Sequence, residues 1–306
     1  MTAMAPPAKP LPRAAPKAPW QVWRDAAGRL SALRIGTLAI LFVPVAIALY
    51  DFATEGFGAR PLNNVIHRTG YWALLFLLTA LAVTPLRRIA RFNRLVDVRR
   101  MIGVGAFCYI ATHLGLYVAD QMFDLWKVAS EIALRLYLTI GFVAWLGLAA
   151  LALTSTDAMV RRLGGKRWQR LHNIIYGLGL LALIHYFQQT KADVSVPTFV
   201  AGLFGWMIGY RLLIKLRNTR DEPPTWMLLA LSIAIAMLTF ICEAIGIGIA
   251  FNVSPFRVLE NAFDFDDLDS IRPGWLVLGA GLIVTAVDAV RARMAVRRPA
   301  AAARPR

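Results

Sequence analysis

Long apolar stretches alternate with short polar connectors along almost the entire chain. Each stretch has the roughly 17 to 25 residues that a helix needs to cross a hydrocarbon core. The stretches lie at about 35–50, 67–86, 101–119, 134–154, 171–188, 195–214, 226–250 and 274–290. The pattern therefore predicts an all-α, polytopic transmembrane helix bundle of about eight helices, with no room for a sizeable soluble domain.

The same pattern divides the chain into three segments. Residues 1–34 are rich in Pro, Ala, Lys and Arg, and we expect a disordered basic tail because they hold too little apolar material to fold. Residues 35–220 hold the first six helices, and residues 221–306 hold two more helices and a second basic tail. The small residues 46–48 resemble a signal-peptide cleavage site, but the long basic segment before them favours a retained first helix.

Composition supports a membrane protein and gives its orientation. The 306 residues are 58% hydrophobic and 17% charged, with a mean hydropathy of +0.55 and a formal net charge of +16. The basic residues form short clusters between apolar spans, as membrane topology requires and nucleic-acid binding does not. Basic connectors alternate with acidic ones, so the positive-inside rule predicts that both termini are cytoplasmic. The basic connectors are 87–100, 161–170, 215–220 and 291–306, and the acidic ones are 51–55, 120–131 and 260–269.

Several kinds of chemistry are missing from the sequence. The two cysteines, Cys108 and Cys242, lie in separate apolar spans with no CxxC or CxxCH around them, which argues against a disulfide framework and covalently attached haem. The sequence contains no P-loop and no GxGxxG that opens a strand and helix unit. The cytoplasmic connectors are also too short to fold as a nicotinamide domain, so we expect any electrons to be received from, and delivered to, other molecules.

Four histidines are the main candidates for function, because ionisable groups within a membrane are costly. His113 and His185 lie about 12 and 14 residues into helices that both start at the cytoplasmic face, so each is roughly 18 to 21 Å above that face. Two imidazoles at matched depth on parallel helices can bind one haem iron from both sides. The alternative is a pair of hydrogen-bonded core histidines.

His172, Arg99 and His67 are weaker candidates. His172 and Arg99 fall in the cytoplasmic half at similar depth, where they would hold a second haem or a flavin, with Arg99 contacting an anionic group. The alternative is that Arg99 is only another positive-inside charge. His67 starts the second helix on the outer side, where it would neighbour the outer haem, bind a quinone headgroup or be an ordinary interfacial residue.

One geometric feature is not explained by a regular helix. His172 and His185 are 13 residues apart, which places them about 140° apart around an ideal helix. Gly177 and Gly179 lie between them, where a π-bulge or a close porphyrin approach would change the geometry. Small residues are equally common where membrane helices pack together.

Several motifs together resemble the MsrQ (YedZ) family of haem-binding membrane subunits, within the ferric-reductase-like transmembrane superfamily. Their order and spacing over about residues 60 to 214 match that family. The matching runs are Val65-Ile66-His67-Arg68-Thr69-Gly70, Thr84-Pro85-Leu86, Arg99-Arg100-Met101-Ile102-Gly103, Ala111-Thr112-His113-Leu114, Arg135-Leu136-Tyr137-Leu138-Thr139, Leu153-Thr154-Ser155-Thr156-Asp157-Ala158-Met159, Leu163-Gly164-Gly165-Lys166-Arg167-Trp168-Gln169-Arg170-Leu171-His172-Asn173 and Ile184-His185-Tyr186.

The resemblance implies a six-helix haem core in the bacterial inner membrane with one or two b-type haems. It implies electrons taken from the quinone pool or from a cytoplasmic flavin reductase and passed to MsrP, a periplasmic molybdenum-containing subunit that reduces methionine sulfoxide in oxidised proteins. Such a subunit performs no substrate chemistry of its own. The family is also described as binding FMN, although the sequence has no flavin motif.

The chain departs from the superfamily in two ways. Other members have two histidines on each ligand helix, whereas Arg99 stands near one of those positions here, which leaves the ligand opposite His172 open. Two helices follow residue 220, and the family core offers no role for them. A stand-alone transmembrane ferric reductase and a proton-coupled transporter that uses intramembrane histidines are the alternative functions.

Overall fold

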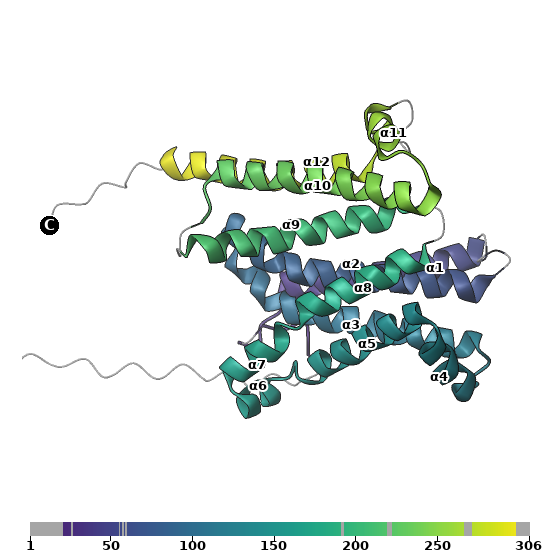
Figure 1. Ribbon diagram of the computed structural model, residues 1–306. Coiled ribbons are helices and arrows are strands. Elements are labelled where there is room, and N and C mark those ends of the chain that lie inside the picture. The colour runs from purple at the N-terminus through teal and green to yellow at the C-terminus, as the bar shows by residue number, and fades with distance from the viewer. Residues whose placement is uncertain are drawn as a thin grey trace, which may run out of the picture.

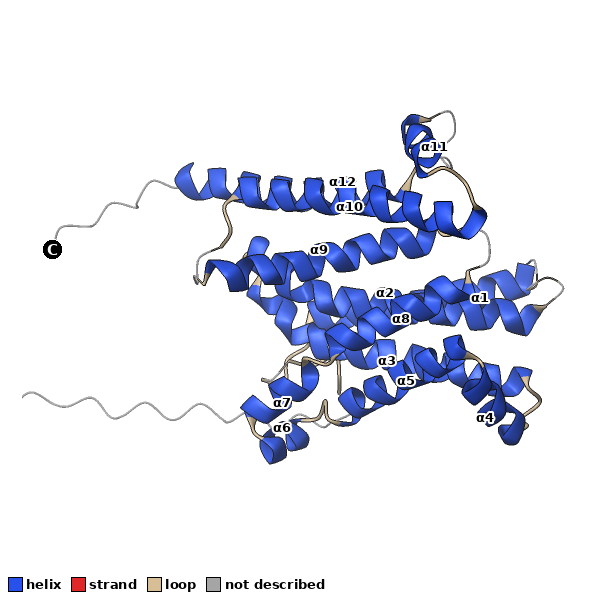
Figure 2. Ribbon diagram, viewed as in Figure 1, coloured by secondary structure: helices blue, strands red, loops and turns tan. Residues whose placement is uncertain are grey.

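The protein is almost entirely helical, as the hydrophobic pattern predicts (Figures 1 and 2). Helices account for every described element except an isolated bridge between Arg24 and Leu30. The computed structural model describes residues 21–25, 27–54, 56, 58, 60–190, 193–218, 222–265 and 271–297. Most of the first expected tail and residues 298–306 of the second therefore lie outside the described residues.

The helices follow one another along the chain with short connections. They are α1 (Ala32–Thr54), α2 (Pro61–Ile89), α3 (Val96–Asp120), α4 (Leu125–Leu134), α5 (Leu136–Leu153), α6 (Asp157–Leu163), α7 (Gly165–His172), α8 (Ile175–Gln189), α9 (Ser195–Arg217), α10 (Thr225–Phe251), α11 (Pro255–Glu260) and α12 (Pro273–Arg297), with short 3₁₀ turns at Asn93–Leu95 and Asn261–Phe263. Seven of them, α1, α2, α3, α5, α9, α10 and α12, are long and apolar enough to cross a membrane.

The remaining expected span, 171–188, differs from the prediction. It is not one helix, because α7 ends at His172 and the 15-residue α8 begins at Ile175. Asn173 is the C-cap of α7, and its side-chain oxygen accepts a hydrogen bond from the side chain of Gln169 at 2.9 Å. The break explains why the spacing of His172 and His185 does not fit one regular helix.

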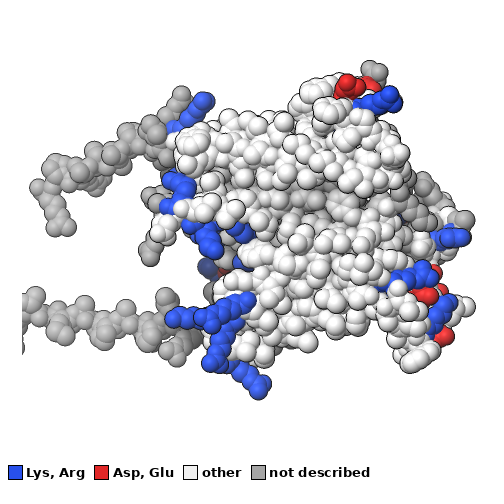
Figure 3. Space-filling model, in the orientation of Figure 1, with Lys and Arg blue, Asp and Glu red and all other residues white. Residues whose placement is uncertain are grey.

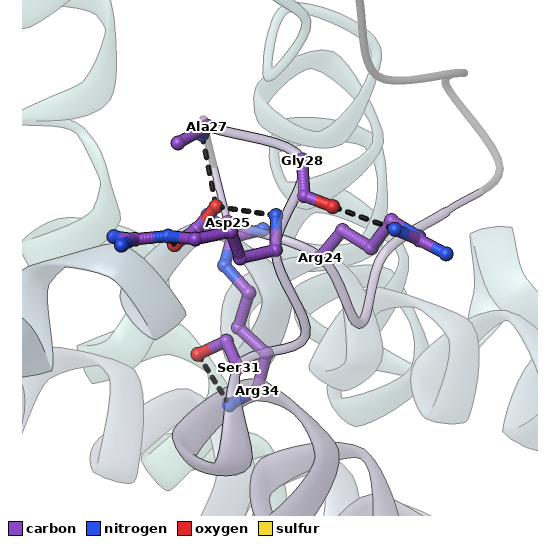
Figure 4. A network of polar contacts seen from close by, with 7 residues as sticks. Arg24, Asp25, Ala27, Gly28, Ser31 and Arg34 are labelled. Carbon is purple, nitrogen blue, oxygen red and sulfur yellow. Dashed lines mark hydrogen bonds and ion pairs between the residues drawn. The ribbon is translucent and has the colours of Figure 1, made fainter. Parts of the chain in front are cut away.

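Helix α1 begins at Ala32, three residues before the expected boundary at Ile35, and the segment before it is partly structured. The carboxylate of Asp25 accepts hydrogen bonds from the backbone N–H groups of Ala27 and Arg29, both at 2.9 Å (Figure 4). The bond from Arg29 lowers the pKa of Asp25 below its usual value. A compact turn therefore precedes the first helix.

The core lies where α2 packs against α3, α8 and α9. In the most apolar 18-residue segment of α2, half of the residues are buried within the protein. This share is larger than in the other six membrane-spanning helices. Helices α10 and α12 pack against each other and against α9, and they form a layer on one side of the bundle (Figure 1). Small residues allow this close packing: a Cβ added at Gly202 of α9 would lie 2.4 Å from Val277 of α12.

The two ends of the bundle differ in charge (Figure 3). We call one the basic end, which carries mainly Lys and Arg, and the other the mixed end, which carries both signs. At the mixed end Arg68 lies 2.5 Å from the carboxylate of Asp51, and Arg135 forms an ion pair with Glu131. These ion pairs neutralise part of the positive charge at the mixed end. The basic end therefore carries the larger positive charge.

Candidate functional site

His113 is fixed by helix α2. Its Nδ1 lies 2.8 Å from the carbonyl oxygen of Ile66, within hydrogen-bond distance. Its ring lies against Gly70, one turn further along α2, where an added Cβ would be 3.0 Å from two ring atoms. A contact of 3.0 Å is tighter than nine in ten real Cβ contacts, so the glycine gives the imidazole room to lie against the α2 backbone.

His185 is fixed in the same way by helix α5. Its Nδ1 lies 2.8 Å from the carbonyl oxygen of Tyr137, and its ring lies against Gly141, where a Cβ would be 2.8 Å from ring atoms. On each helix the residue that supplies the carbonyl group and the glycine are four positions apart, which is about one helical turn. Two different helix pairs therefore hold an imidazole by the same arrangement.

The hydrogen bonds determine which ring nitrogen is available for binding. A carbonyl oxygen only accepts, so Nδ1 of both rings must carry the proton and donate it. Nε2 then has a free lone pair, and the described residues give it no hydrogen bond in either ring. A histidine whose Nδ1–H donates to a backbone carbonyl while Nε2 remains free is the usual form of a metal ligand.

The structure brings the two rings together at one level of the bundle. Their centroids are 6.3 Å apart and their planes are inclined by 83°. Two imidazoles that bind one metal ion through bonds of about 2 Å have ring centroids about 6 Å apart. His113 and His185 therefore have the spacing required to bind one metal ion between them.

The cavity around the two histidines suits a flat apolar group better than a bare ion. It has a volume of about 240 Å³, far more than the ~10–15 Å³ that one water needs, and it is walled mainly by apolar and aromatic side chains of α2, α3, α5 and α8. The described part of the chain holds no cluster of three or more His, Cys, Asp or Glu side chains that would coordinate a metal ion. Two imidazoles suffice for iron whose other positions are filled by porphyrin nitrogens.

One buried donor in the cavity wall has no partner. Trp145 of α5 lines the cavity and stacks on Phe142, with ring centroids 5.9 Å apart. Its indole Nε1 is buried and makes no hydrogen bond. Because an unsatisfied buried donor is costly, this N–H is a sign that a group other than the protein belongs in the cavity.

His67 lies at the polar rim of the same cavity. It is exposed on α2 at the mixed end, where Asn63, Asp120 and Gln189 also line the opening. The structure therefore places His67 beside the paired histidines and not at a separate site.

His172 and Arg99 are at the basic end, outside this cavity. The His172 ring stacks on Trp168 with centroids 3.8 Å apart, and its two nitrogens lie 3.1 Å from the carbonyl oxygen of Trp168 and 3.4 Å from the hydroxyl of Ser155. Arg99 is half-buried and close enough to act on His172 electrostatically. The structure therefore places both residues in one region, without a direct contact between them among the described interactions.

Arg211 of α9 is a further residue of this region that the sequence analysis did not single out. It donates hydrogen bonds to the hydroxyl of Tyr176 at 3.1 Å and to the carbonyl oxygen of Leu81 at 2.5 Å. The Leu81 carbonyl needs a donor because Pro85, four residues later in α2, has no N–H. A basic residue within the span 195–214 and a proline within another span were the signals present in the sequence.

Comparisons with known proteins place the chain among haem-binding membrane subunits by sequence. Residues 69–183 match the family described as ferric reductase like transmembrane component; this segment includes His113 and His172 and ends two residues before His185. No solved structure matches the chain.

Curated proteins named protein-methionine-sulfoxide reductase heme-binding subunit MsrQ are similar to it over nearly their whole length. The one from Rhodospirillum rubrum is 40% identical over 193 residues, which are 61% of this chain and 92% of that protein. The one from Xanthomonas euvesicatoria is 39% identical over 198 residues, 61% of this chain and 90% of that protein. The one from Xanthomonas campestris strain 8004 is 38% identical over 204 residues, 63% and 93% respectively.

Proposed function

The chain belongs to the MsrQ family of haem-binding membrane subunits of protein-methionine-sulfoxide reductase, and from this we propose that it is a b-haem electron-transfer subunit. The observation that carries the proposal is the pair of intramembrane imidazoles, His113 and His185, with centroids 6.3 Å apart. Haem bound there would supply one-electron transfer within the bilayer. The protein itself would carry out no substrate chemistry.

In this proposal His113 and His185 would hold the haem iron through Nε2. The carbonyl groups of Ile66 and Tyr137 hold the proton on Nδ1 and set the orientation of each ring, and the hydrogen bond also raises the basicity of the ligand nitrogen. Apolar side chains of the cavity exclude water. His67 at the rim is suited to donate a hydrogen bond to a polar edge of the cofactor.

The proposed partner is MsrP, a periplasmic molybdenum-containing subunit that reduces methionine sulfoxide in oxidised proteins. The mixed end would then face the periplasm and the basic end the cytoplasm, in the bacterial inner membrane with both termini cytoplasmic. The cavity opens toward the mixed end, where His67 and Asp120 lie, and this supports electron delivery on that side. The donor would be the quinone pool or reduced flavin from a cytoplasmic flavin reductase.

A second cofactor position at the basic end is part of the proposal. His172 and Arg99, with Arg211 and Arg87 close to Arg99, would hold a second haem or FMN through its anionic groups. A redox centre there would shorten the distance that electrons travel from cytoplasmic flavin to the outer haem.

Reconstitution tests the function. The purified protein in vesicles should absorb in the Soret region, become reduced when a donor is added anaerobically, and become reoxidised when MsrP with methionine sulfoxide is present on the mixed side. Protein without Soret absorbance would point to a proton-coupled transporter. Haem that is reoxidised by ferric chelates but not by MsrP would point to a stand-alone ferric reductase.

A further inference from the structure

A second cavity lies between α8, α9 and α10, near the mixed end. It has a volume of about 490 Å³ and is lined mainly by apolar and small side chains. Gly205 and Gly246 are among them. A Cβ built at Gly246 would meet nothing within 4 Å, and one built at Gly205 would meet only Ile235, at 3.8 Å. The absence of side chains at these two positions leaves room in the cavity.

The mouth of this cavity faces the hydrocarbon phase. Leu238, Cys242 and Gly246 line it and are exposed on one side of α10, an apolar helix long enough to cross the membrane. A molecule that enters between these residues therefore comes from the lipid and not from water, and this selects for an apolar ligand.

One carboxylate lies in this apolar wall. The Glu243 side chain is 2% exposed and its Oε1 is 3.4 Å from Arg272, which precedes α12 at the mixed end and is 26% exposed. Among the described residues no hydrogen bond reaches Oε2. A buried carboxylate within a membrane helix is costly and marks a functional site by default, because a single contact of this length compensates little of the desolvation cost.

The last turns of helix α8 line both cavities. Tyr186 and Gln189 line the histidine cavity together with His185, while Phe187 and Thr190 line the second cavity. At ~100° per residue these two sets of side chains leave α8 in directions roughly 120° apart, so the cavities lie on different sides of the helix, at a separation on the order of one helix diameter, roughly 10 Å. Electrons can cross such a distance without another cofactor.

From these observations we propose that the second cavity binds a hydroquinone from the lipid phase and that Glu243 accepts its protons. The proposal rests on the proposed function, since the oxidant is the haem iron between His113 and His185. The hydroquinone loses two protons and two electrons and becomes the quinone. Each proton passes to the Glu243 carboxylate and then, beside Arg272, to water at the mixed end, while the electrons cross α8 one at a time.

Filling the cavity tests the site. Gly246→Leu adds a side chain at the cavity wall, starting from a Cβ that meets nothing within 4 Å, and Gly279→Leu on α12, where a Cβ also meets nothing within 4 Å, is the matched control. With a short-chain ubiquinol as donor, we expect Gly246→Leu to slow haem reduction at least about tenfold and Gly279→Leu to leave it unchanged. Glu243→Gln should slow the same step with reduction by dithionite unaffected.

A binding measurement that needs no electron transfer accompanies these rates. Cys242 lines the cavity and Cys108 on α3 does not, and both are exposed. A lipid-soluble maleimide should modify both cysteines in the detergent-solubilised protein, and added short-chain ubiquinone should protect Cys242 but not Cys108. Equal modification of Cys242 with and without ubiquinone would overturn the proposal. A bound phospholipid whose acyl chain stays in the cavity when ubiquinone is added would also overturn it.

The proposal and the function on which it rests fail differently. If the protein holds haem, is reduced by dithionite and passes electrons to MsrP, but ubiquinol reduces wild type and Gly246→Leu at equal rates, the hydroquinone site is wrong and the electron-transfer function stands. If purified protein contains no haem, the proposed function is wrong.

Discussion

Each paired histidine occupies space that a side chain on the neighbouring helix would otherwise need. Gly70 and Gly141 provide this space, and the carbonyl one turn before each glycine holds the imidazole. The identity of the two histidines could be predicted from sequence, because only they reach matched depth on parallel helices. Their glycine and carbonyl partners could not, because these contacts depend on how α2 meets α3 and how α5 meets α8.

The glycines give the first prediction. Gly141→Ala should displace the His185 ring, because the new Cβ would lie 2.8 Å from its atoms, and the protein should lose most of its haem. Gly115→Ala on α3, where a Cβ meets nothing within 4 Å, is the control and should bind haem normally. Haem content per protein, measured by absorbance after purification, decides between them, and full haem content in Gly141→Ala would contradict the role of this contact.

Arg211 gives a second prediction at this scale. Arg211→Met removes the donor to the Leu81 carbonyl. The free energy of unfolding in detergent should therefore fall by about 1–3 kcal/mol. Pro85→Ala restores the N–H that α2 lacks, so the same Arg211 substitution should cost less in a Pro85→Ala background. Equal losses in both backgrounds would show that the Leu81 contact is not what Arg211 contributes.

His172 gives the third prediction. If His172 holds a second cofactor, His172→Ala should abolish haem reduction by cytoplasmic flavin while the spectrum of the outer haem stays unchanged, and Arg99→Ala should weaken the same step. Anaerobic stopped-flow absorbance with reduced flavin measures both. A His172→Ala protein with full cofactor content and an unchanged rate would reduce His172 to a residue that packs on Trp168 at the end of α7.

At the scale of elements, hydrophobic length was enough to predict most spans, because α1, α2, α3, α5, α9, α10 and α12 each fill one apolar stretch. Hydrophobic length did not predict the break between α7 and α8. The polar end of α7 lies directly before the apolar α8, and a hydropathy average over this stretch does not separate the two helices. The hydropathy pattern also treated residues 120–131 as a connector, although Leu125–Leu134 forms α4, whose side-chain cap is Asp124. Short helices at membrane surfaces lack the length signal that identifies spans.

The separation of α10 and α12 from the other helices gives the fourth prediction. His113, His185 and the residues that hold them all lie within 35–220, so truncation after Arg220 should retain haem in a protein that still inserts. The same truncation removes the α10 wall of the second cavity, and reduction by ubiquinol should therefore be lost while reduction by dithionite remains. A well-inserted truncation without haem would instead show that α10 and α12 help to build the histidine site.

At the scale of the whole molecule, two cavities share the last turns of α8 as a wall and lie near one charged end. Helices α2, α3, α5 and α8 enclose the histidine pair, and α10 and α12 add a layer that carries a buried carboxylate. Charge at the helix ends sets the direction of the bundle in the membrane. The proposed electron transfer toward the mixed end requires that both histidines bind the same iron.

Electron paramagnetic resonance of the oxidised purified protein, read together with its haem content, tests that condition most directly. If His113 and His185 bind one iron, the wild-type spectrum should contain a low-spin signal from iron with two imidazole ligands. Replacing either histidine with Ala should remove that signal, through loss of haem or conversion to high spin. Persistence of the full low-spin signal in both the His113→Ala and the His185→Ala proteins would contradict the account.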